Sequence, residues 1–536
     1  MGLQQPTNKA PLHIKAVAPL NRTALEALPV VDKNLYLQWQ RVRKWLTGDH
    51  PPVHGGEEAQ ARITATELEL LLEAKLVERT ERAQVKATCI LFPVPEPNKG
   101  RRRLIRHTKC INDHFGKDSL EGITLTTTSQ VVMSAHQGRF AITFDFAAYF
   151  DQHLLEEKER VYHGFPHGSE WYRLCRLPMG QRQAVDVAHT ATCLLTSFEL
   201  PPGVTATAYI DDVRFLGQDQ NSVLKAARTF INRCREANVT INDVPNHITD
   251  EQILSRIRTQ GEFLGVDINY EQRRVRLATK SQAKLAAAYE AFQHKGFTYR
   301  NCLALYGMLF FVLQVTRESA AKYYYCLKEY SSVARQIQSE PDKLDTTYTC
   351  PPERARYLSQ WVEEALKNPW TNVRTPLEQT DGDDAHILIT DASSWGWGAL
   401  LRRRGTSRWE TASGRWADAW LGAKTSAWAE PEAVARAVAH FFPTKPEAPL
   451  IILTDSRVAS DALEKGRSGA FAVNKAVTSV FTMVDRHLVH VKHIAGTSNP
   501  ADGLSRGVTT GPNINIATQQ ALGITAGLFP SQRTAQ

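Results

Sequence analysis

The stretch VTATAYIDDVRFLG, residues 204–217, decides how the first half of the chain is interpreted. It predicts two short strands joined by a turn that carries the adjacent aspartates Asp211 and Asp212. Neighbouring carboxylates repel each other unless a cation lies beside them, so the dipeptide alone is explained most simply as a solvated turn. Upstream, residues 140–150 (FAITFDFAAYF) predict a buried strand that carries Asp145. Because Mg²⁺ is held by few carboxylates on rigid backbone, the three aspartates together predict a site for two divalent ions.

Patterns outside this region predict two kinds of fold in succession. Residues 64–76 predict a helix that starts with a capping box, and residues 89–107 predict two strands around a Pro/Gly turn. Residues 281–340 have mainly helical periodicity, and a polar, proline-containing connection follows. HILITDASSWGWGALLRR, residues 386–403, then starts a strand-turn-strand unit. We therefore expect an α+β region followed by an α/β domain.

The composition favours an intracellular protein with a polyanionic partner. Its 536 residues include 64 Lys and Arg against 56 Asp and Glu, a net charge of +8 that suits nucleic acid. The sequence shows neither the apolar run of a membrane span nor that of a signal peptide, so we expect a cytoplasmic or nuclear protein without a membrane partner. The eight cysteines form no CxxC pair, which favours reduced, mostly buried thiols over a zinc site or disulfides.

Five motifs, in order, resemble the fingers and palm of reverse transcriptases. They are Arg103–Asn112, Asp145–Phe150, Leu177–Gly180, Tyr209–Asp212 and Phe263–Val266. The Tyr-Ile-Asp-Asp box is the most specific of them. The resemblance implies a right-hand polymerase with fingers, palm and thumb, which copies an RNA template into DNA from deoxynucleoside triphosphates.

The resemblance also implies roles for the matching residues. Asp145 and Asp211 would hold the catalytic ions, with Asp212 assisting. Phe150 would lie under the sugar and exclude a ribonucleotide 2′-hydroxyl, and a core aromatic is the alternative. Arg103, with Lys99 as a second cation, would grip the triphosphate, and a solvated basic turn is the alternative for Arg103. Gly180 would let the backbone approach the template or the nucleotide closely.

The second unit resembles the RNase H domain of retroelements, in which four acids hold two ions. The implied ligands lie at strand ends, near a helix start and in a loop before a helix: Asp391, Glu430, Asp455 and Asp502. The last lies in NPADGLSR, residues 499–506, which closely resembles the final RNase H motif. The cofactor would be Mg²⁺, two ions per active site, with Mn²⁺ as a substitute. The implied fold is a mixed sheet with flanking helices, and the implied partner is an RNA/DNA hybrid.

Two choices remain open within this nuclease motif set. Glu430 and Glu432 lie two residues apart on a predicted helix and cannot both face one site. The family pattern favours Glu430, with the helix starting just after it at Pro431, while Glu432 is the alternative. His487, His490 and His493 alternate faces on a predicted strand and cannot chelate one ion together, although His493 could assist product release as in some relatives.

Departures from the family pattern support a second hypothesis, a decayed or domesticated copy that acts as an RNA-binding scaffold. Residues 181–184 (QRQA) lack the usual Ser-Pro, and residues 241–250 (INDVPNHITD) lack a clear lysine. His107 stands in place of an acid, and Met179 in place of a glutamine. All seven implied metal-site carboxylates are nevertheless present, which argues for an active enzyme.

The order of the motifs predicts the domain organisation. It comprises an N-terminal extension (1–59), fingers and palm (60–280), thumb-like helices (281–345), a connection (346–384), an RNase H domain (385–507) and a polar tail (508–536). Neither an aspartic-protease triplet nor an integrase-like segment stands in the sequence. This arrangement resembles most closely the DIRS-like retroelements, including the VIPER type, and next the BEL/Pao elements. The oligomeric state is not indicated.

Overall fold

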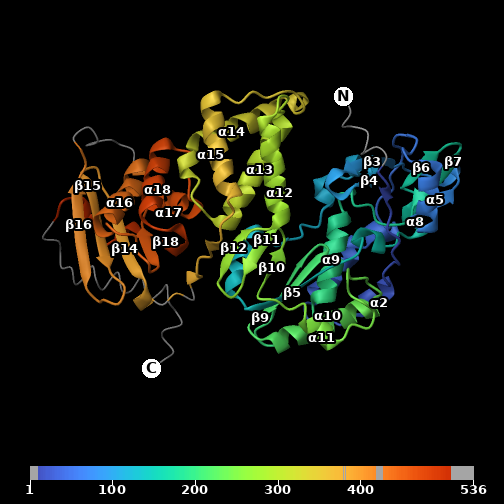
Figure 1. Cartoon of the computed structure of the whole chain (residues 1–536), viewed down its shortest axis with the longest axis horizontal. Coiled ribbons are helices and arrows are strands. Elements are labelled where there is room, and N and C mark those ends of the chain that lie inside the picture. Colours follow the sequence, from blue (N-terminus) through green and yellow to red (C-terminus); the bar gives the residue numbers. More distant parts are fainter. Residues whose placement is uncertain (1–9, 378–379, 381, 418–425, 509–536) are drawn as a thin grey trace. The chain divides into compact units, whose positions relative to one another are not determined.

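The computed structural model describes residues 10–377, 380, 382–417 and 426–508, so residues 509–536 of the predicted tail lie outside it (Figure 1). The chain divides into two units, Met1–Thr127 with Gln137–Thr259, and Thr128–His136 with Gln260–Gln536. The predicted fold class, an α+β region followed by a domain with a mixed sheet and flanking helices, is confirmed. Within the described ranges, no helix is long and apolar enough to cross a bilayer.

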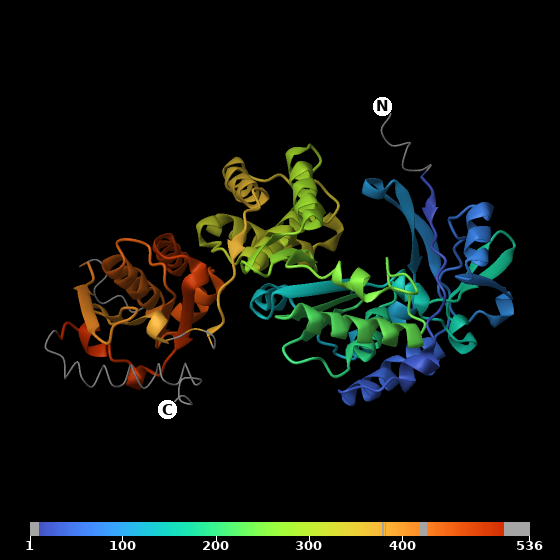
Figure 2. The ribbon, with the colours of Figure 1, turned by 60° about the horizontal axis from the view of Figure 1, so that its bottom comes forward.

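A three-stranded antiparallel sheet forms the centre of the first unit. Its order is β5 (Phe140–Asp145), β9 (Asp212–Gly217) and β8 (Thr205–Tyr209). Alternate apolar side chains, Ile142 and Phe144 on β5 and Val213 and Phe215 on β9, are buried in one core. Two helices, α9 (Ala184–Thr196) and α10 (Gln220–Glu236), contribute to that core and lie along the sheet in Figures 1 and 2. This packing makes the sheet a rigid platform for the aspartates at its end.

Two further three-stranded sheets and several short helices complete the first unit. One sheet has the order β1 (Leu12–His13), β4 (Arg101–His107), β3 (Ile90–Glu96), and the other β2 (Val77–Thr80), β7 (Glu170–Leu174), β6 (Gly164–His167). The predicted capping box starts α5 (Ala65–Glu73), where Thr64 and Glu67 cap each other's backbone. This unit also contains α6 (Lys109–His114), α8 (Glu157–Arg160) and α11 (Asp250–Leu254).

Residues 10–50 are an integral part of this unit. Strand β1 pairs in parallel with β4, and α3 (Asn34–Val42) packs against α9. The segment also contains α2 (Arg22–Ala27) and α4 (Lys44–Thr47). Trp39 on α3 and Trp45 on α4 are almost fully buried. The segment therefore supplies part of the hydrophobic core beneath the central sheet.

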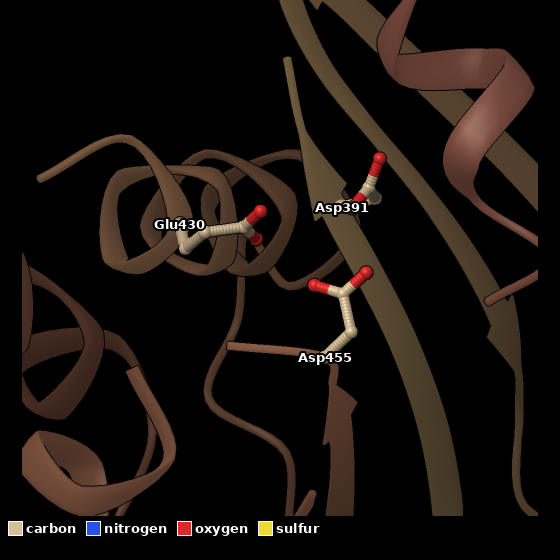
Figure 3. A group of neighbouring side chains, drawn as sticks. All are labelled: Asp391, Glu430 and Asp455. Atoms are coloured by element: carbon tan, nitrogen blue, oxygen red, sulfur yellow. The ribbon is translucent and has the colours of Figure 1, made fainter. Parts of the chain in front are cut away.

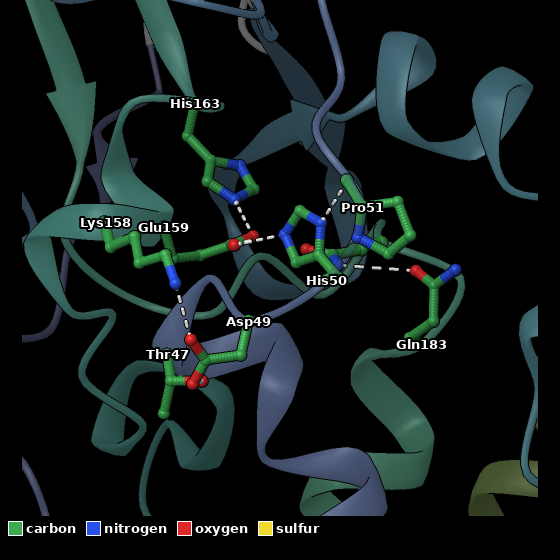
Figure 4. Close-up of polar contacts among 9 residues, drawn as sticks. Thr47, Asp49, His50, Pro51, Lys158, Glu159, His163 and Gln183 are labelled. Atoms are coloured by element: carbon green, nitrogen blue, oxygen red, sulfur yellow. Dashed lines mark hydrogen bonds and ion pairs between the residues drawn. The ribbon is translucent and has the colours of Figure 1, made fainter.

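A buried ionic cluster fastens the end of this segment to α8 (Figure 4). The Glu159 carboxylate lies between two imidazoles, 2.5 Å from His50 Nε2 and 3.0 Å from His163 Nε2, and all three side chains are inaccessible to solvent. Burial alone would lower the pKa of His50, but the hydrogen bond and charge of Glu159 outweigh it and raise the pKa above its ordinary value. The cluster is therefore most stabilising when His50 is protonated.

The first part of the second unit combines a four-stranded antiparallel sheet with a helical layer. The sheet has the order β10 (Gln260–Phe263), β11 (Val266–Asn269), β12 (Arg274–Leu277), β13 (Thr371–Asn372). The helices are α7 (Thr128–Met133), α12 (Thr279–Gln293), α13 (Tyr299–Thr316), α14 (Tyr324–Ser339) and α15 (Pro352–Leu366). The stretch predicted as a polar connection thus contains a four-turn helix, α15, whose buried Trp361 stacks on Tyr323.

The C-terminal domain is built on a five-stranded mixed sheet. Its order is β16 (Trp409–Arg415), β15 (Gly396–Arg402), β14 (His386–Ala392), β17 (Leu450–Thr454), β18 (Val489–His493), with β14, β17 and β18 parallel. The first face is covered by α16 (Ser426–Phe441), α17 (Arg457–Lys465) and α18 (Phe471–Met483). Ile387 and Ile389 point to the other face, where α19 (Asp502–Ser505) packs on β14 and β15. Because both faces are buried, the strands are almost continuously apolar.

Candidate active sites

The sheet register of the first unit places the three palm aspartates side by side. Asp145 ends β5 directly opposite Asp212, the first residue of β9. Asp211 lies just before it in the turn, and its carbonyl accepts a hydrogen bond from the backbone N–H of Phe146 (3.0 Å). The hairpin and strand end that the sequence predicts are therefore adjacent in the fold, as a two-ion site requires.

Two side chains of α9 hold the turn between β8 and β9. Ile210 adopts a left-handed backbone conformation (φ 54°), which is strained for a β-branched residue. Its N–H donates to His189 Nδ1 (3.1 Å), and its carbonyl accepts from the Thr192 hydroxyl. Burial lowers the pKa of His189, so the ring stays neutral and able to accept that bond. The motif comparison missed both residues because they carry no sequence signal of their own.

The four predicted nucleotide-contacting residues occupy different settings in the first unit. Lys99 is exposed and lies 3.8 Å from Glu96, and Arg103 on β4 is exposed and contacts Met179. Phe150 is half-buried against the palm core. The packing of the protein itself explains why a glycine stands at position 180, since a Cβ there would lie 2.9 Å from the Arg106 carbonyl oxygen.

In the second unit, three of the four predicted nuclease acids form one cluster (Figure 3). Asp391 lies at the end of β14, Asp455 follows β17, and Glu430 points from α16 toward both. One carboxylate oxygen from each lies within 4.8 Å of the others. The parallel pairing of β14 with β17 brings the two strand-end aspartates to one edge of the sheet.

The cluster is electrostatically unfavourable without a cation. Burial, together with the charges of Asp455 and Asp502, raises the pKa of Asp391 to about 7, although the Ser505 hydroxyl donates to it (2.7 Å). Burial and the charges of Asp391 and Asp455 raise the pKa of Glu430 to about 8. Glu430 Oε2 is buried and has no hydrogen-bond donor. Clustered oxygen ligands with an unsatisfied buried acceptor fit a hard divalent cation such as Mg²⁺.

The geometry of α16 separates the two candidate glutamates. Glu430 belongs to the acidic cluster, whereas Glu432 forms an ion pair with Arg436 one turn away (2.9 Å). The helix does not start just after Glu430, as predicted, but already includes Ser426, with Pro431 inside it. Pro431 has no backbone N–H to donate, so it removes one hydrogen bond from α16, but the helix continues through it.

Asp502, the fourth predicted acid, stands beside the cluster at the start of α19. Its carboxylate lies 3.5 Å from Arg506 Nε and its charge contributes to the raised pKa of Asp391. Among the histidines, His493 Nε2 contacts the Asp455 carbonyl oxygen (3.0 Å). His493 therefore supports the backbone that carries a cluster residue.

Comparisons with known proteins identify relatives of part of the chain. No family model matches the chain. It is similar to the retrovirus-related Pol polyprotein from transposon 412 of Drosophila melanogaster, 24% identical over 226 residues, or 41% of this chain and 17% of the relative. It is also similar to the Pol polyprotein from transposon gypsy of the same organism, 22% identical over 316 residues, or 58% of this chain and 27% of the relative. The chain thus spans less than a third of either relative.

Among solved structures, the chain aligns with the foamy viral protease-reverse transcriptase. The complex with double-stranded DNA gives a TM-score of 0.47 at 14% identity, covering 90% of this chain and 83% of that chain. The complex with an RNA/DNA hybrid gives 0.46 at 14% identity, covering 90% and 64%. The curated relatives are transposon polyproteins, in agreement with the retroelement class predicted from the motifs, and the DIRS-like subgroup stays a prediction.

Two polar residues of the final motif have roles that the motif alone did not reveal. The Ser505 hydroxyl donates to Asp391, and the Asn499 amide donates to the carbonyl of Thr390 (2.9 Å), one residue before Asp391. Both bonds join positions more than a hundred residues apart. The motif therefore holds the end of β14 in addition to supplying Asp502.

Proposed function

We propose that the chain is an RNA-directed DNA polymerase with RNase H activity, and that each activity uses a two-ion carboxylate site. The observation that carries the proposal is the convergence of Asp391, Glu430 and Asp455, distant in sequence, to within 4.8 Å. The register of Asp145 opposite Asp212 supports the corresponding polymerase site. The similarity to Pol polyproteins of transposons supports the combination of both activities in one chain.

In the polymerase site, Asp145 and Asp211 would hold Mg²⁺ or Mn²⁺, with Asp212 assisting. The ions would lower the pKa of the primer 3′-hydroxyl and neutralise the charge of the triphosphate. Arg103, exposed on β4, would donate to phosphate oxygens, with Lys99 as a second cation. Phe150 would lie under the sugar and exclude a 2′-hydroxyl.

In the nuclease site, Asp391, Glu430, Asp455 and Asp502 would hold the ions. The bound metal would activate a water molecule and stabilise the charge on the scissile phosphate. Ser505 and Asn499 would keep Asp391 in place by bonding its carboxylate and the preceding carbonyl. The RNA strand of an RNA/DNA hybrid would be the substrate, held mainly through phosphates and sugars.

The proposal extends to organisation and origin. The fingers and palm, thumb-like helices, connection and RNase H domain would follow the motif boundaries given above, with residues 10–59 added to the fingers and palm. The source would be a retroelement of the DIRS-like group. The RNA template, deoxynucleoside triphosphates and the hybrid would be its partners.

The test uses the whole chain with two labelled substrates. Wild type should extend a DNA primer on an RNA template with deoxynucleotides and Mg²⁺, and should cut the RNA of a hybrid. Asp211→Asn should abolish extension and spare cleavage, and Asp391→Asn with Asp455→Asn should do the reverse. Hybrid binding without either activity in wild type would instead favour the scaffold hypothesis.

A further inference from the structure

Asp145 has a hydrogen-bond partner from a segment that the motif comparison left without a function. The side-chain amide of Asn242 donates from Nδ2 to Asp145 Oδ2 (2.7 Å). The backbone N–H of Asn242 also donates to the Asp145 carbonyl (2.8 Å). The same carboxylate that the proposed function assigns to the metal is thus bonded through one of its two oxygens.

A third residue fixes which way the Asn242 amide points. Lys15 Nζ, from the segment after β1, donates to Asn242 Oδ1 (3.1 Å). An ammonium group can only donate and an ionised carboxylate can only accept. A flipped amide would set N–H groups against Lys15 and the amide oxygen against Asp145, and both contacts would be repulsive. The two charged neighbours therefore hold the amide in the orientation that donates to Asp145.

We propose that Asn242, oriented by Lys15, is a positioning residue of the polymerase site that reserves Asp145 Oδ1 for a metal ion. This inference rests on the proposed polymerase function. A fixed donor on Oδ2 prevents the carboxylate from rotating and from binding a cation through both oxygens. Hydrogen-bonded partners of this kind orient metal ligands and tune metal affinity.

The chemistry of the amide explains why a neutral donor suits this position. A lysine in direct contact with Asp145 would compete with the metal ion for the carboxylate. An amide supports the ionised carboxylate without adding a full positive charge, while the ammonium of Lys15 stays one residue further away. Because Lys15 is exposed, its bond is screened by water, and its effect on the site is smaller than that of Asn242.

The measurement is the Mg²⁺ concentration that gives half-maximal primer extension, with deoxynucleotide KM and RNase H cleavage recorded on the same preparations. Asn242→Ala should raise the Mg²⁺ requirement about 10-fold or more, because loss of a bonded partner of a metal ligand costs 10- to 100-fold in affinity or activity. Lys15→Gln should raise it only about 2- to 5-fold. RNase H cleavage should stay at the wild-type level, which checks that the chain is folded and active.

Two further comparisons make the assignment decisive. The double variant should be no worse than Asn242→Ala, because Lys15 acts through Asn242. Asn246→Ala, an exposed asparagine of the same segment, should match wild type. An unchanged Mg²⁺ requirement in Asn242→Ala, or fully additive losses in the double variant, would overturn the inference. A wild-type chain that does not extend primers at all would contradict the proposed function instead.

Discussion

Replacing Glu430 by glutamine should stabilise the metal-free C-terminal domain while removing a ligand of the proposed metal site. Glu430 titrates at about 8 in the fold against 4.5 for an exposed glutamate, so at neutral pH folding takes up a proton. The roughly 2.5 pH units between 4.5 and 7, at about 1.4 kcal/mol each, give a destabilisation of up to about 3.5 kcal/mol. Glutamine has no such cost, so the variant should gain roughly 1–3 kcal/mol at pH 7 without metal.

The sign of the pH dependence follows from the raised pKa. The destabilisation is absent below the unfolded pKa of 4.5 and grows as pH rises toward 8, so the advantage of glutamine should shrink to less than about 1 kcal/mol at pH 5. Added Mg²⁺ should reverse the ranking, because it stabilises a wild-type chain that binds it and the variant has lost a ligand.

Hydrogen exchange of the β14 and β17 amides is the appropriate assay because it reports on this domain alone within a chain of several domains. Glu432→Gln is the matched control, since Glu432 is paired with Arg436 outside the cluster, and it should change protection little with or without Mg²⁺. Lower protection in metal-free Glu430→Gln than in wild type at pH 7 would refute the electrostatic reasoning. A metal-dependent effect in Glu432→Gln but not in Glu430→Gln would reverse the assignment of the two glutamates.

Three further predictions concern the first unit and its substrate. Phe150→Ala should increase the incorporation of ribonucleotides, since it removes the ring expected to exclude the 2′-hydroxyl. An unchanged preference for deoxynucleotides over ribonucleotides in primer extension would contradict that role. Hybrid binding should weaken steeply with salt because phosphate contacts release counterions, and a flat titration would mean that nucleic acid is not the partner. Glu159→Gln should cost about 3 kcal/mol near pH 6, since it leaves the buried, protonated His50 without its carboxylate. The stabilisation by the His50–Glu159 pair is complete below the unfolded histidine pKa of 6.5 and is lost as pH rises through the raised pKa of His50. Above that pKa, urea unfolding should show a smaller difference in unfolding free energy between Glu159→Gln and wild type.

Local features of the fold could be predicted from the sequence because their causes are local. The capping box at Thr64 sets a helix start through its own backbone bonds, and the apolar runs on either side of Asp211 set a hairpin. Strand-end acids such as Asp391 and Asp455 could be placed because an apolar run ends directly before them. The fold class could also be predicted, because it depends on the order of these locally determined strands and helices along the chain.

Contacts between distant segments could not be predicted from these patterns. An amphipathic pattern shows that a helix has a buried face but does not name its partner, so the packing of α3 on α9 was not foreseen. Asn242 lies 97 residues from the carboxylate that it bonds, and nothing in its neighbours marks it. The helix start before Pro431 was missed because a proline near a helix end is compatible with both the first turn and the interior.

The pairing of β1 with β4 has a consequence for how much of the chain can fold alone. A fragment that begins at residue 60 would retain every polymerase motif, yet it would leave the β4 backbone at Arg102 and Arg103 as an uncovered sheet edge. It would also remove Trp39 and Trp45 from the palm core, at a cost of about 3–5 kcal/mol for each buried tryptophan. Exposed edges of this kind recruit other strands, so the fragment should aggregate when expressed. We therefore expect that a fragment of the first unit must include the chain from about Pro11 onward in order to fold independently.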